Sequence, residues 1–261
     1  MNELPENSMA TSWMQSGRSL FADPLNWAWV LVIAAWGILL LLAFTGQWHL
    51  FHLDGLATHF SISFALKLLI FSAAWQVMTI AMMLPSTLPF ARLFIKVSSS
   101  QTNHHLVLLA FLAAYLAVWT GFALIAFVVD LGLQLLGQHK FHHQFDLILP
   151  IALIVAGLFQ FSPLKEQCLY ACRHPYSFLT HHYQQGAIAA WKLGIRHGLY
   201  CLGCCWALML VMVSVGAGHL VWMLALTGVM TLERSWKHGR SLVPVVGASL
   251  IGIGSWLMMW R

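Results

Sequence analysis

The sequence predicts an all-α, polytopic membrane protein: a bundle of about seven transmembrane helices that forms one domain over residues 1–261. Composition is the first reason. Hydrophobic residues make up 60% of the chain and charged residues only 8%, whereas about 25% are charged in an ordinary soluble domain. The mean hydropathy of +0.76 and the 13 tryptophans suit a chain surrounded by lipid, with aromatic side chains at the interfaces. Water-soluble classes are therefore excluded.

Long apolar segments are the second reason. Seven of them approach the roughly 20 residues that a helix needs to cross the hydrocarbon core. They cover residues 27–44, 68–84, 106–129, 147–161, 199–215, 220–232 and 242–260. The fourth contains Pro150, which membrane helices tolerate when neighbouring groups satisfy the freed carbonyl. Small residues at 216–219 predict a turn that joins the fifth and sixth segments as a helical hairpin.

Basic residues predict the orientation of the chain. Ten of the 13 Lys and Arg lie in residues 1–26, 86–105, 163–197 and 234–241, which share one side if all seven segments cross. The positive-inside rule places that side in the cytoplasm. We therefore expect a bacterial inner-membrane protein with a cytoplasmic N-terminal tail (1–26), no cleaved signal, a cytoplasmic cysteine-containing segment (163–197) and an external C-terminus. We expect the lipid bilayer to surround the protein. The basic residues are scattered singly along the chain, so they do not indicate nucleic-acid binding.

The cysteines form the clearest functional pattern. All five lie in one stretch of the chain, as Cys168, Cys172, Cys201, Cys204 and Cys205. Two cysteine groups separated by a spacer are typical of a thiolate metal site. Residues 168 and 172 would share a helix face if the chain after Pro163 starts a helix. The alternatives are buried free cysteines and thiol-exchange chemistry at a helix N-terminus, whereas a reducing cytoplasm disfavours disulfides.

Methionines extend the sulfur pattern. Met209 continues the helix face of the cysteines in the fifth segment. Met82 and Met83 end the second segment, at the same predicted depth. Sulfur ligands favour Cu(I), zinc or an iron–sulfur cluster, and thioethers favour Cu(I) in particular. We therefore expect a metal site, most simply for Cu(I), formed by the five cysteines with Met82, Met83 and Met209, although methionine is also a routine core residue.

Three further features carry expectations of their own. Glu233 ends the sixth segment, and we expect it to pair with Arg234 or Lys237. Residues 186–198 suit a short helix lying at the membrane interface. Histidines gather with aspartates in the predicted outer loops, where they could bind Zn(II), Cu(II) or Ni(II). These residues are His49, His52, His59, His139, His142, His143, Asp54, Asp130 and Asp146.

Three motifs resemble a group of bacterial multi-pass membrane proteins that are described as predicted metal-binding. They are Met-Met-Leu-Pro at 82–85, the Cys168-x3-Cys172 pair, and Cys-Leu-Gly-Cys-Cys-Trp at 201–206. The similarity extends over residues 75–236, and the last string is its most specific part. The resemblance implies a helical membrane fold with a site at the cysteines.

The function that follows is the handling of a soft metal at the cytoplasmic membrane face, as a transporter, chaperone or assembly factor. Such a protein would exchange the metal with a donor or acceptor protein. The alternatives are a membrane thiol oxidoreductase that uses Cys201 and Cys204, and a structural subunit of a membrane complex. Hydrolase and nucleotide-dependent readings have no motif to support them, so a non-enzymatic role is favoured.

Overall fold

The computed structural model describes residues 24–45, 63–101, 103–137, 145–215 and 220–260. Over these ranges the regular elements are all helices, so the predicted all-α bundle is confirmed. The helices are α2 (Pro24–Phe44), α4 (Phe64–Ser98), α5 (His104–Gly137), α6 (Phe145–Gln160), α7 (Pro163–Arg173), α8 (Pro175–His182), α9 (Ala187–Val215), α10 (Leu220–Ser235) and α11 (Gly239–Met259). Residues 1–23 of the N-terminal tail, the histidines of the outer clusters and the 216–219 turn lie outside the described residues, and the side chains of Asp130 and Asp146 are not described. Residues 24–26 of the predicted tail belong to α2.

Each of the seven predicted segments corresponds to a helix, but the helices differ in length. Five of those described are long and apolar enough to cross a membrane: α2, α4, α5, α9 and α11. A sixth crossing arises if α6 and α7, which meet at 67°, are one broken span. Helix α10 has 16 residues and is therefore about 24 Å long. The structure thus gives five or six spans by length, where the sequence predicts about seven.

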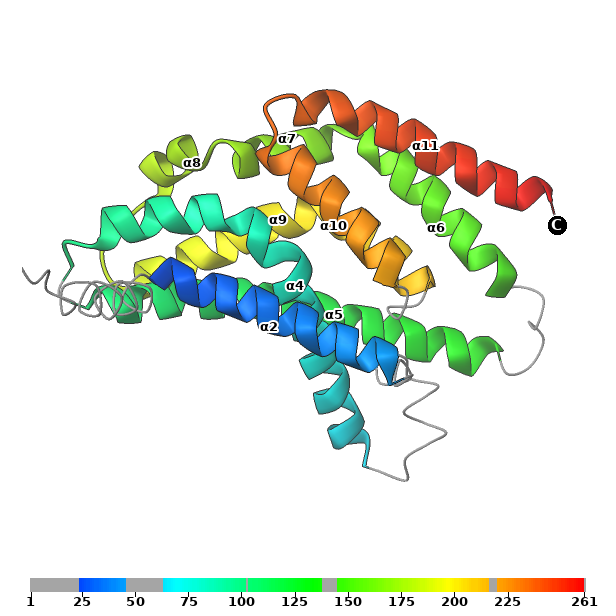
Figure 1. Ribbon diagram of the computed structural model, residues 1–261, viewed down its shortest axis with the longest axis horizontal. Coiled ribbons are helices and arrows are strands. Elements are labelled where there is room, and N and C mark those ends of the chain that lie inside the picture. Colours follow the sequence, from blue (N-terminus) through cyan, green and yellow to red (C-terminus); the bar gives the residue numbers. More distant parts are fainter. Residues whose placement is uncertain (1–23, 46–62, 102, 138–144, 216–219, 261) are drawn as a thin grey trace, which may run out of the picture.

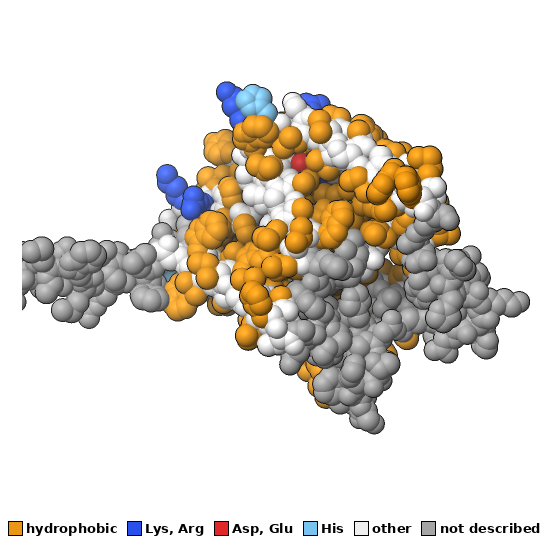
Figure 2. All heavy atoms as spheres, turned by 45° about the vertical axis from the view of Figure 1, so that its right-hand side comes forward, with side chains coloured by type: hydrophobic (Ala, Val, Ile, Leu, Met, Phe, Trp, Pro, Cys, Tyr) orange, Lys and Arg blue, Asp and Glu red, His pale blue; other side chains and the backbone are white. Residues whose placement is uncertain are grey.

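Apolar side chains cover much of the outside of this bundle. Ile33, Ile188 and Val221 are 69%, 77% and 78% exposed, and many other large apolar residues share their exposure. Figure 2 shows such side chains over the described part of one face, with Lys and Arg gathered toward its upper left. Because a soluble monomer rarely exposes apolar patches of this extent, the surface is compatible with a lipid surrounding.

Helix α9 is the centre of the bundle. It packs against α5, α6, α7 and α10, and Figure 1 shows it passing through the middle of the molecule. Gly194 permits the close approach of α5, because a Cβ atom there would lie 2.4 Å from the Phe111 carbonyl oxygen. Residues 187–198 are the first turns of this 29-residue helix. The prediction that 186–198 is helical is confirmed from Ala187 onward, but the helix is not short, because no proline or turn interrupts it before Val215.

Helix α4 also runs further than its apolar segment. It continues through Pro85 and Pro89 to Ser98, and it bends along its length in Figure 1. Proline removes one helical hydrogen bond and its ring pushes the preceding turn away, which accounts for the bend. The bend brings residues on both sides of the prolines against α9, α10 and α5, where the candidate site lies.

The segment between α6 and α9 is folded as predicted. The Ser162 hydroxyl accepts a hydrogen bond from the Lys165 backbone N–H, and Pro163 occupies the first turn of α7. The chain after Pro163 therefore does start a helix, and it places Cys168 and Cys172 one turn apart. With α8 and the start of α9, little of residues 163–197 is left as loop.

A buried ion pair fastens α7 to the end of α10. Lys165 Nζ lies 2.6 Å from Glu233 Oε2, and the two side chains are 1% and 3% exposed. Gln160 donates to the other carboxylate oxygen at 3.2 Å, and Arg173 donates to the carbonyl of Glu233. The expected pairing of Glu233 with Arg234 or Lys237 is therefore wrong. The adjacent Arg234 points in a different direction from Glu233, and Lys237 lies beyond the end of α10 at Ser235.

Lys165→Met should lower the free energy of unfolding by about 3–5 kcal/mol, because it leaves the Glu233 carboxylate buried without a cation. The matched control is Arg240→Met, which breaks the exposed pair with Glu166 and should cost at most about 1 kcal/mol. Denaturation of both variants in detergent micelles measures the difference. Equal losses would show that burial of the Lys165–Glu233 pair does not matter.

Candidate functional site

Three thiols on one face of α9 lie in the bundle core. Cys201, Cys204 and Cys205 are at most 3% exposed, and their spacing of three and four residues places them side by side on the helix. All three lie in the middle of α9, which begins at Ala187. The hypothesis that Cys201 and Cys204 stand at a helix N-terminus is therefore wrong, and the helix dipole is not the charge that acts on them.

Arg234 supplies that charge. Its side chain projects from the last turn of α10 and is only 7% exposed. Its Nη2 atom donates to the sulfurs of Cys201, Cys204 and Cys205 at 3.0, 2.9 and 3.4 Å. One nitrogen thus contacts all three sulfurs, so no two of them can be further apart than twice the longest contact. A buried guanidinium needs such electron-rich partners, because an uncompensated charge in the core is costly.

The guanidinium is also held by groups other than sulfur. Nη1 donates to the Ser86 hydroxyl at 2.7 Å, and Nη2 donates to the Cys201 carbonyl oxygen at 3.0 Å. Ser86 follows Pro85 directly in the bent part of α4. The bend in α4 therefore contributes to the position of Arg234.

Helices α4 and α5 complete the sides of this cluster. The Cys205 thiol donates to the Met83 sulfur at 3.8 Å. The Tyr115 hydroxyl lies 3.0 Å from the Cys201 sulfur and accepts from Thr87 at 3.3 Å. The equal depth that the sequence predicts for the two sulfur groups thus becomes a direct contact at Met83. Met82 and Met209 are both fully buried in the same core cluster.

The cysteines of α7 reach the same place. A Cβ atom at Gly203 would lie 2.6 Å from the Cys168 sulfur, so the missing side chain makes room for that thiol. Cys172 interacts with the thiol of Cys204. Both cysteine groups of the sequence therefore meet across the long segment that separates them, and all five cysteines are free thiols.

These side chains do not form a ready ligand set. Within the described residues, no group of three or more His, Cys, Asp or Glu side chains is arranged to hold a metal ion. The Nη2 atom of Arg234 lies between the three α9 sulfurs. A metal bound by all three would therefore need the guanidinium to move aside.

Arg234 and Tyr115 are the residues of this cluster that sequence reasoning missed. The sequence predicts that Arg234 is a basic residue of the cytoplasmic side and a partner for Glu233, and that Tyr115 is part of an apolar segment. An arginine one residue after an acid at the end of an apolar segment was an available signal, because an ionisable group at that depth needs a partner. No sequence signal identifies Tyr115.

Comparison with known proteins supplies one finding. A family model described as PpoB2, copper chaperone, matches residues 72–257. The match includes all five cysteines, Met82, Met83, Met209 and Arg234. No curated protein and no solved structure matches the chain.

Arg234→Gln should slow alkylation of the α9 thiols several-fold, because the thiolate is the reactive form and a nearby guanidinium favours it. Arg234→Lys keeps the positive charge, so its alkylation rate should fall less than that of Arg234→Gln. The measurement is the rate of labelling by a small membrane-permeant maleimide, read by mass spectrometry, with detergent-unfolded protein as the accessibility control. An unchanged rate in Arg234→Gln would show that the guanidinium does not activate these sulfurs.

Proposed function

The chain belongs to the PpoB2 copper chaperone family, and from this membership we propose that it binds Cu(I) among its buried sulfurs and passes the ion to a partner protein. We call the proposed site the thiol pocket: Cys168, Cys172, Cys201, Cys204 and Cys205 with Met83. The observation that carries the proposal is that thiols of α7 and a thioether of α4 pack against the α9 thiols. Soft sulfur donors of both kinds suit Cu(I).

Charge also favours a monovalent ion. Cu(I) held by two thiolates has a net charge of −1, and the adjacent Arg234 guanidinium makes the assembly neutral. Neutrality matters because the site is buried and the neighbouring Lys165–Glu233 pair is already balanced. The family gives no support to zinc or to an iron–sulfur cluster. Zinc in proteins takes thiolate, imidazole and carboxylate ligands, and a thioether at Met83 would be unusual for it.

Two further methionines belong to this proposal. Met82 and Met209 are fully buried in the core cluster that holds the thiols, and Met209 follows Cys205 by one helical turn. In this proposal, the thioethers of Met82 and Met209 are additional ligands that can bind Cu(I) when a cysteine is protonated. A chaperone needs only this one site and an exit, whereas a transporter needs a ligand-lined path across the whole bilayer. The chaperone role is therefore the one we propose.

Cu(I) binding tests the function directly. Protein purified in detergent under anaerobic, reducing conditions should bind Cu(I), as measured by elemental analysis and by competition with a chromogenic Cu(I) chelator. Replacing Cys201, Cys204 and Cys205 together by serine should abolish binding. Met83→Leu should weaken it, whereas Met258→Leu, at a 44% exposed methionine of α11, should not. Full binding by the triple serine variant would exclude the thiol pocket.

For the membrane arrangement, we propose that all seven long helical segments cross the bacterial inner membrane with the N-terminus inside, supported by the uneven distribution of Lys and Arg. A reporter enzyme inserted after Gln185 should then be cytoplasmic, and one fused after Trp260 external. The second fusion is decisive for α10, because six crossings would return the C-terminus to the cytoplasm. An external reporter at Gln185 would reverse the topology.

A further inference from the structure

His197 is a buried histidine that the thiol pocket does not include. It lies on α9 one helical turn before Cys201, on the same helix face, and is 3% exposed. Its ring stacks on Phe90 at 4.1 Å between centroids. Within the described part of the chain its Nε2 atom has no hydrogen-bond partner. A buried polar atom without a partner costs free energy, so this nitrogen calls for a ligand that the fold itself does not supply.

On one side, His197 borders the thiol pocket. It interacts electrostatically with both Arg234 and Cys204. Its ring centre lies 5.9 Å from that of Tyr115, whose hydroxyl contacts the Cys201 sulfur. The imidazole is therefore next to the sulfurs, displaced along α9 by a single turn.

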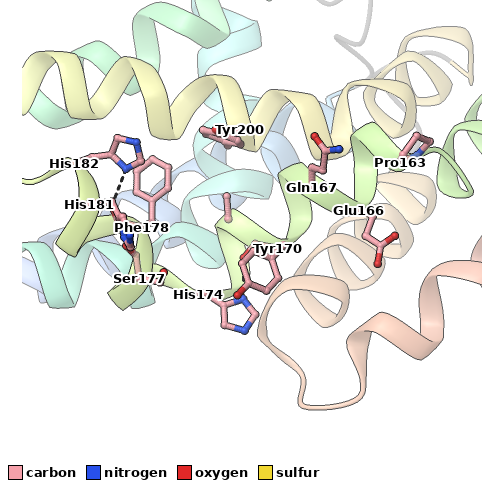
Figure 3. Close-up of a pocket in the computed structure, with 11 residues that line it drawn as sticks. Pro163, Glu166, Gln167, Tyr170, His174, Ser177, Phe178, His181, His182 and Tyr200 are labelled. Atoms are coloured by element: carbon pink, nitrogen blue, oxygen red, sulfur yellow. Dashed lines mark hydrogen bonds between the residues drawn. The ribbon is translucent and has the colours of Figure 1, made fainter.

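On the other side, His197 meets an aromatic layer that leads to the surface. Its ring lies 6.0 Å from the ring of Phe178 on α8. Phe178 in turn contacts the rings of His182 at 4.7 Å and Tyr200 at 5.5 Å. These three residues line a groove of about 580 Å³ between α7, α8 and α9. In Figure 3, His181, His182 and Phe178 lie together at one end of that groove.

The groove presents histidines in a form suited to a soft metal. His174, His181 and His182 each place Nδ1 at 2.7–2.9 Å from the backbone carbonyl four residues earlier. An Nδ1–H that donates to a carbonyl leaves Nε2 as the nitrogen with a free lone pair. Neutral imidazole nitrogens of this kind are copper ligands. Imidazoles thus occur both in the groove and at His197, with the Phe178 ring between them.

We propose that Cu(I) passes between this groove and the thiol pocket through His197, which holds the ion transiently at its Nε2 atom. The inference rests on the proposed copper function and adds an exit route to it. Each step exchanges one ligand of Cu(I) for another, so the ion keeps its oxidation state and no electron is needed. Without an imidazole at this depth the charged ion would cross the Phe90–Phe178 layer with no donor, which is energetically costly.

The test separates transfer from binding. Full-length protein loaded with Cu(I) is mixed with excess chromogenic Cu(I) chelator, and both the transfer rate and the equilibrium affinity are measured. His197→Phe keeps an aromatic ring against Phe90 but removes the nitrogens. Transfer should slow by about tenfold or more, the size of effect that loss of one group at a metal site produces. The affinity should stay near that of the unaltered protein, because all pocket sulfurs remain.

Two other variants keep the result decisive. His182→Ala, at a half-buried residue that lines the groove, should also slow transfer. His105→Phe, at an exposed histidine of α5 away from the groove, should transfer at the original rate.

The outcomes distinguish the two proposals. If the unaltered protein binds no Cu(I), the proposed function fails and the route fails with it. If it binds Cu(I) but His197→Phe and His182→Ala both release it at the original rate, only the route is wrong. An affinity loss as large as the rate loss would make His197 a resident ligand and overturn its transient role.

Discussion

The structure of the site depends on one buried charge. Arg234 lies in the core with its guanidinium among three sulfurs, a hydroxyl and a carbonyl oxygen. A cation in that position is stable only if electron-rich groups surround it and if no other charge competes for them. The adjacent Glu233 does not compete, because Lys165 and Gln160 occupy its two oxygens. The Lys165–Glu233 pair therefore leaves the charge of Arg234 to the sulfurs.

This arrangement explains why the site needs helices that are distant in sequence. Helix α9 provides the sulfurs closest to the guanidinium, and α10 provides the guanidinium itself. The bend of α4 contributes Ser86 and Met83 on one side. On the other side, α7 brings Cys168 against Gly203, at a distance that any side chain at position 203 would prevent. The pocket is thus a consequence of how four helices pack. The Lys165–Glu233 ion pair holds α7, the least apolar of the four, against α10.

Sequence reasoning recovered the parts of this structure that depend on local pattern. Apolar runs located all seven of these helical segments, and the helix considered after Pro163 is α7. Cysteine and methionine spacing identified residues that the fold does bring together. Sequence reasoning failed where two interacting residues lie far apart along the chain. The pairing of Glu233 with Lys165 spans 68 residues, and nothing at either position specifies the other. Similarly, apolar length alone did not show that α9 begins at Ala187, because its first turns mix charged and apolar residues.

Arg234 also limits how the proposed copper site can work. The guanidinium lies between the three α9 sulfurs, at the place where the proposed ion would bind them. If Cu(I) bound to these sulfurs, the guanidinium would lose up to three of its partners. It need not leave the core, because the Ser86 hydroxyl and the Cys201 carbonyl oxygen remain as acceptors. From there it would still balance the negative charge of a dithiolate Cu(I) complex. Under the proposed function, the same side chain would stabilise the pocket both before and after the ion binds, which suits a protein that must release its metal.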